Sequence, residues 1–86
     1  MAKFMAVHTL PMTQQQFMTM GQEMMSKIPK GFTYKLTYCA FDEHKFFCEW
    51  DAPSKEALEQ GFKSMKMPFD AVYPVTIYDG ASNTWS

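Results

Sequence analysis

A strand–helix–strand unit that occurs twice, about 40 residues apart, constrains this chain more than any other feature of its sequence. Each predicted helix begins after a capping residue, Thr13 in the first half and Ser54 in the second. Each helix also carries one glycine on its predicted buried face, Gly21 and Gly61. A duplicated unit of this kind, with right-handed crossovers, predicts an antiparallel four-stranded sheet with both helices on one face.

The predicted elements follow one another in the order β-α-β-β-α-β. Aromatic and branched residues predict strands over residues 3–9, 32–41, 45–52 and 71–78. Thr13 and Gln16 form a capping-box pattern that begins a helix over 14–28, and a second helix follows Ser54 until Met67-Pro68 stops it. This order is that of the ferredoxin-like α+β sandwich, for which we expect the strand order 4-1-3-2.

Composition and charge place the chain among small globular proteins. Its 86 residues are 47% hydrophobic and 16% aromatic, which supports one ferredoxin-like domain over residues 1–79 with a C-terminal tail over 80–86. The net charge is -1 and the eight basic residues are spread along the chain, which argues against nucleic-acid binding. Apolar runs are too short for a signal peptide or a membrane span, so we expect a cytoplasmic protein with no membrane partner.

The hairpin between the second and third strands predicts the state of the two cysteines. A three-residue loop pairs Tyr38 with Cys48 and leaves Cys39 on the opposite face of the sheet, so both thiols are expected to be free. A two-residue loop would instead put Cys39 directly opposite Cys48. The three-residue loop is favoured because it keeps one face uniformly apolar and pairs Lys35 with Asp51 on the other.

Two helices cover only one face of such a sheet, so the composition of the second face matters. We expect the open face to hold, among others, Phe4, Ala6, His8, Phe47, Glu49 and Asp51, and the helix side to hold Met5, Val7, Tyr38, Cys48 and Trp50. An open face with that apolar content is too hydrophobic for a solvated sheet. The pattern predicts a homodimer in which two sheets pack face to face and enclose a ligand cavity.

His8 and Glu49 are the first candidate site residues, because they lie on neighbouring strands. Imidazole and carboxylate suit a metal ion, and a carboxylate can also orient a histidine base. The alternative is that His8 ends a strand and Glu49 is an ordinary surface or interface acid. Known catalytic motifs, such as a phosphate loop or a nucleophile elbow, are absent from the sequence.

Three segments, KFMAVH, FFCEWDAPSKEAL and MPFDAVYPV, resemble a family of small, mostly uncharacterised ferredoxin-like proteins that includes a nickel-binding member. The resemblance extends from Lys3 to about Val75. It implies a ferredoxin-like fold, a dimer and nickel binding through histidines, with His8 as the corresponding ligand. Thr33 and Met67 stand where the family's further histidines are expected.

These observations predict a non-enzymatic homodimer that binds a small ligand or a divalent metal, such as nickel, at the open sheet face. His8, Glu49 and Asp51 are the predicted metal ligands, shared across the dimer. The alternative is a cofactor-independent enzyme of the dimeric α+β barrel type, with His8 as base and Tyr34 or Tyr73 shaping the pocket. A third interpretation is an interaction module without a ligand.

Overall fold

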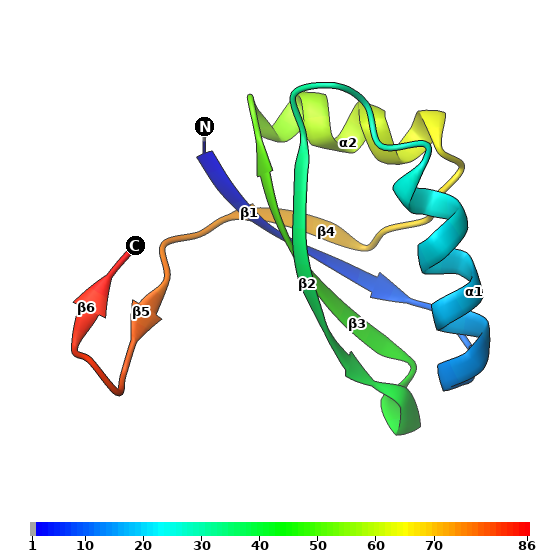
Figure 1. Ribbon diagram of the computed structural model, residues 1–86, viewed down its shortest axis with the longest axis horizontal. Helices are drawn as coiled ribbons and strands as arrows, with labels where there is room; N and C mark the ends of the chain where they lie inside the picture. Colours follow the sequence, from blue (N-terminus) through cyan, green and yellow to red (C-terminus); the bar gives the residue numbers. More distant parts are fainter. Residues whose placement is uncertain (1) are drawn as a thin grey trace.

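The computed structural model describes residues 2–86 and shows a four-stranded antiparallel sheet covered on one face by two α-helices (Figure 1). The main elements are β1 (Ala2–Thr9), α1 (Gln14–Met25), β2 (Thr33–Ala40), the 3-10 turn η1 (Phe41–Glu43), β3 (Lys45–Ala52), α2 (Lys55–Ser64) and β4 (Ala71–Pro74). The strand order β2-β3-β1-β4 confirms the predicted order and the ferredoxin-like α+β fold.

Both helices begin at the predicted residues. Thr13 Oγ1 accepts a hydrogen bond from Gln16 N at 3.1 Å, and the Gln16 side chain accepts one from Thr13 N at 2.8 Å, which completes the capping box. Ser54 Oγ accepts from Ala57 N at 3.1 Å. Helix α1 ends at Met25, earlier than the predicted end at residue 28. Gly31, with φ of 94°, then reverses the chain into β2 in a conformation that favours glycine.

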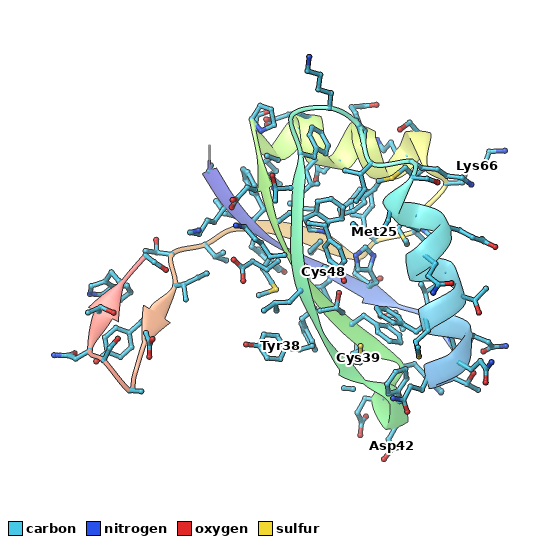
Figure 2. All side chains as sticks on the ribbon, viewed as in Figure 1. Met25, Tyr38, Cys39, Asp42, Cys48 and Lys66 are labelled. Atoms are coloured by element: carbon cyan, nitrogen blue, oxygen red, sulfur yellow. The ribbon has the colours of Figure 1, made fainter. Side chains whose placement is uncertain are left out.

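The predicted register of the hairpin between β2 and β3 is wrong by one residue. Four residues join the strands, because η1 is followed by His44 in a left-handed conformation, so Cys39 pairs with Phe46 and Tyr38 with Phe47. Cys39 therefore shares a face with Cys48, and both are free thiols. Figure 2 shows Tyr38 and Cys39 pointing to opposite sides of β2, with Cys39 toward α1. A bulge between Tyr34 and Leu36, near the start of β2, shifts the pairing of β2 with β3 a second time.

The predicted faces of β1 are also reversed. Phe4, Ala6 and His8 face the helices and are buried, whereas Met5 and Val7 lie on the open face. Because almost every residue of β1 is apolar, its pattern alone does not distinguish the two faces, and the polar character of His8 suggested the wrong one. On β3 the prediction is confirmed, since Cys48 and Trp50 are buried on the helix side.

The core lies between the sheet and α2. Its buried members are Phe4, Ala6, Cys48, Trp50, Ala52, Leu58, Phe62 and Val72. Leu58 and Phe62 come from α2 and are at most 1% exposed, so this helix supplies the centre of the core. Every side chain of α1, in contrast, is exposed or half-buried.

The C-terminal segment, which includes the predicted tail over residues 80–86, contains a second pair of strands. The last sheet strand ends at Pro74, short of the predicted residue 78, and a separate hairpin follows from β5 (Tyr78–Asp79) and β6 (Thr84–Trp85). Tyr78 packs against Trp85 with ring centroids 4.9 Å apart. Figure 1 shows this hairpin standing away from the sheet and helices.

Within residues 2–86, neither α-helix is long and apolar enough to cross a membrane.

Candidate functional site

His8 lies at the C-terminal end of β1, on the helix side of the sheet, and is only 3% exposed. Its Nδ1 lies 2.7 Å from the carbonyl oxygen of Pro68, in the segment between α2 and β4. Its ring meets Phe62 edge to face, with centroids 5.2 Å apart. Because a carbonyl oxygen can only accept, Nδ1 carries the proton, and Nε2 is left as a hydrogen-bond acceptor when the ring is neutral.

The surroundings of His8 favour its neutral form. Burial lowers the pKa of the imidazole below its ordinary value of 6.5, and it outweighs the opposing effects of the Pro68 hydrogen bond and the charge of Asp70. Asp70 is itself exposed, and its pKa is lowered by the hydrogen bond from Thr9 and by Lys45. His8 is therefore a fixed, uncharged ring in the protein interior at neutral pH.

A pocket beside His8 lies between α1 and the sheet. Its lining is almost wholly apolar and consists of His8, Phe17, Met20, Gly21, Met24, Met25, Ile28, Tyr34, Cys48, Trp50, Phe62 and Met67. The space open to the centre of a water molecule is about 50 Å³. One water needs roughly 10–15 Å³ by this measure, so the pocket accommodates a molecule of only a few heavy atoms without adjustment.

The few polar groups in the lining are all neutral. Tyr34 OH and Thr37 Oγ1 form a close hydrogen bond, and Thr37 Oγ1 donates to Cys48 Sγ at 3.2 Å. Burial raises the pKa of the Tyr34 hydroxyl and raises that of the Cys48 thiol to about 11. Trp50 is 5% exposed, and its buried Nε1 has no hydrogen-bond partner within residues 2–86.

Glu49 and Asp51 lie on the opposite face of the sheet from His8. Glu49 pairs with Met5 and Leu36 in the middle of the open face. Asp51 forms ion pairs with Lys3 at 3.8 Å and with Lys35 at 3.4 Å. The predicted site on the open face near His8 is therefore wrong in its placement of the histidine, because one chain cannot bring His8 to the two carboxylates through its own sheet.

The side chains around His8 do not fit a divalent cation. The only other strong metal donor that lines the pocket is the Cys48 thiol, whose pKa burial raises to about 11, which makes the thiolate costly to form there. Across residues 2–86, the structure gathers no three His, Cys, Asp or Glu side chains that could hold a metal ion. Because Nδ1 of His8 is engaged with Pro68, the imidazole could offer only Nε2 to a metal ion, which is one ligand and too few for a site.

Sequence reasoning found two residues of this pocket and missed the others. Tyr34 was predicted to stand near His8 in the enzyme alternative, and it does line the pocket, whereas Tyr73 is exposed on the open face. Phe17, Met20 and Met24 recur at helical spacing, a pattern typical of a core-facing stripe, and here they cover a pocket instead. Gly21 contributes to this space, since a Cβ there would meet no atom within 4 Å, but Gly61 at the equivalent position of α2 leaves none, so the sequence does not distinguish the two glycines.

The comparisons with known proteins agree with this fold. The profile described as "Nickel responsive protein SCO4226-like" matches residues 4–75, and the chain therefore belongs to the SCO4226-like family. The crystal structure of SCO4226 from Streptomyces coelicolor A3(2) is similar, with a TM-score of 0.76 and 18% sequence identity over 91% of this chain and 100% of that one. A search of curated proteins found no match.

Proposed function

We propose that this protein is a homodimeric binding protein for a small, mostly apolar organic molecule, which occupies the pocket between α1 and the sheet. The observation that carries the proposal is the apolar pocket beside a buried, neutral histidine. Ligand sites are typically apolar concavities with a few placed polar groups. Here the lining includes three side chains that carry polar groups, His8, Tyr34 and Trp50, but nearly all of the surface that they present to the pocket is apolar.

The proposed homodimer forms through the open sheet face. Three large side chains of that face are exposed, Leu36 at 42%, Tyr38 at 65% and Tyr73 at 56%, and Met5 and Phe47 lie between them in the sheet. Several exposed, large apolar side chains on one face of a small domain are typical of an interface. Covering this face with a second copy buries it without blocking the pocket, which lies on the other side of the sheet.

Substitution in the open face tests the homodimer. Tyr38→Glu puts a charge next to Glu49 and should shift the sedimentation coefficient from dimer to monomer. Tyr78→Glu, on the exposed C-terminal hairpin, is the matched control and should leave the dimer intact. A monomer for the unsubstituted protein at micromolar concentrations would contradict the proposed assembly.

Gly21 offers a direct test of the pocket. A Cβ at this position meets no atom within 4 Å, and the longer side chain of Gly21→Leu should occupy the space under α1. We expect methylenecyclopentane or cyclopentanone to shift the NMR signals of the pocket residues saturably in the unsubstituted protein and in the Gly21→Ala control. The Gly21→Leu variant should bind neither. Equal binding by both variants would place the ligand elsewhere.

Nickel is the competing ligand, and its support is the description of the family. The metal role of His8, Glu49 and Asp51 stays a prediction. Within one chain, His8 and the two carboxylates would have to bind a metal ion on opposite faces of the sheet. Calorimetric titration of nickel into untagged protein should show no saturable binding that His8→Ala removes. Binding lost in His8→Ala would overturn the organic-ligand proposal, and binding lost only in Glu49→Gln would place a metal at the open face.

A further inference from the structure

Most polar atoms of the pocket lining are used within the protein, and nearly all of the surface left to a bound molecule is apolar. His8 Nδ1 lies 2.7 Å from Pro68 O, and the Tyr34 hydroxyl is hydrogen-bonded to Thr37. Cys48 Sγ accepts a hydrogen bond from the same threonine. An oxygen or nitrogen atom that entered the pocket would lose its water without gaining a partner, so the pocket disfavours ligands with polar groups.

Aromatic rings form one wall of the pocket. Four lining side chains follow one another ring to ring, with centroids 5.2, 5.5 and 4.9 Å apart along the series His8, Phe62, Trp50 and Tyr34. The first two of these contacts are edge to face. An aromatic ring that enters the pocket can extend this series with the same geometry, whereas a saturated ring has neither the flat face nor the polarised edge that such contacts use.

Thioether side chains form a second wall. Met20, Met24 and Met25 come from α1 and Met67 from the segment between α2 and β4, and all four line the pocket. Methionine sulfur is polarisable and makes favourable contacts with aromatic rings, and the unbranched side chain adapts to the shape of its partner. Met25 is 58% exposed, whereas the rest of the lining is buried or half-buried, so the pocket opens beside Met25.

We infer that the pocket selects an aromatic ring without polar groups, bound between the aromatic series and the methionines, over a saturated ring of similar size. This inference rests on the proposed ligand-binding function and names the chemical class of the ligand. The space of about 50 Å³ open to the centre of a water molecule limits the part that enters to a single ring.

Three probes of similar size separate these contributions in NMR titrations. Toluene and phenol differ in CH₃ against OH, and methylcyclohexane replaces the aromatic ring with a saturated one. Phenol should bind about tenfold more weakly than toluene, because its hydroxyl loses its water. Methylcyclohexane is the more hydrophobic hydrocarbon, and a pocket that recognised hydrophobicity alone would bind it more tightly than toluene. We expect toluene to bind more tightly instead, and Gly21→Leu to abolish its binding.

Met24→Leu, with Met18→Leu as the matched control, separates the thioether contacts from the size of the pocket. Leucine nearly conserves the volume of methionine. Met24 lines the pocket, whereas Met18 lies outside the lining and is 61% exposed. We expect Met24→Leu to weaken the binding of toluene about threefold without weakening that of methylcyclohexane, and Met18→Leu to change neither.

Equal affinities for phenol and toluene would overturn the inference, because a polar partner would then be within reach of the ligand. Tighter binding of methylcyclohexane than of toluene, or equal losses for both probes in Met24→Leu, would also overturn it, while the pocket and the proposed function stand. If no probe binds, both the inference and the proposed function fail.

Discussion

The two helices of this protein occupy equivalent places in a duplicated fold, yet they pack in opposite ways. Helix α2 buries Leu58, Gly61 and Phe62 against the sheet, and its glycine lies against the ring of Phe32. Every side chain of α1 is exposed or half-buried, and its glycine borders open space. Helix α2 therefore packs into the core, whereas α1 covers a pocket. The two copies of the repeat share one topology but differ in what their helices do.

The largest expected loss of stability comes from a substitution in α2. Phe62 is 1% exposed and contacts His8, Trp50 and Phe69. Phe62→Ala should lower the free energy of unfolding by about 3–5 kcal/mol, because it removes buried contacts and leaves a cavity. Met24→Ala on α1 should cost clearly less, since that side chain is half-buried. Urea denaturation of both variants measures the difference, and equal losses would break the comparison.

The glycine of α2 should resist substitution. A Cβ on Gly61 would lie 2.6 Å from Cε2 of Phe32, so the ring must move. We expect Gly61→Ala to lower the free energy of unfolding by about 1–2 kcal/mol, since overpacking outweighs the gain in helix propensity. Combining it with Phe32→Leu should recover part of the loss. A stabilised Gly61→Ala would mean that Phe32 adjusts freely and that α2 is not tightly packed.

His8 should make stability depend on pH. Its pKa is lowered in the folded protein, so below about pH 6.5 the unfolded chain binds more protons than the folded chain. Stability should therefore be complete above that pH and fall as the pH drops toward the lowered folded pKa. Urea denaturation between pH 5 and pH 8, a window chosen around roughly 6.5, measures the slope. His8→Gln should flatten it, whereas His44→Gln, at the exposed hairpin tip, should retain it.

The smallest effect, and the only stabilising one, is expected on α1. Gly21→Ala meets no atom within 4 Å and adds a residue of high helix propensity. It should raise the free energy of unfolding by about 0.5–1 kcal/mol. Thermal denaturation of this variant beside Gly61→Ala gives opposite signs for two glycines at equivalent positions. The same sign for both would remove the contrast between the helices.

Local patterns in the sequence predicted most of the fold, because short-range chemistry decides where helices and strands begin. The capping box at Thr13 and Gln16, the cap at Ser54 and the residues of β3 were all predicted at the positions where they occur. The duplicated order of elements then limited the topology, and the sheet has the expected strand order. The residues that line the pocket were harder to predict from the sequence, because Trp50 and Phe62 are of types that an ordinary hydrophobic core also contains.

The sequence by itself determined the elements, their order and the choice of His8 as a residue of interest. Only the tertiary structure decided which face of β1 is buried, because that strand is apolar on both sides and its orientation depends on packing against α2. A four-residue turn likewise set the register of β2, which no local pattern specified. His8 thus became a neutral interior residue beside a pocket, separated by the sheet from Glu49 and Asp51.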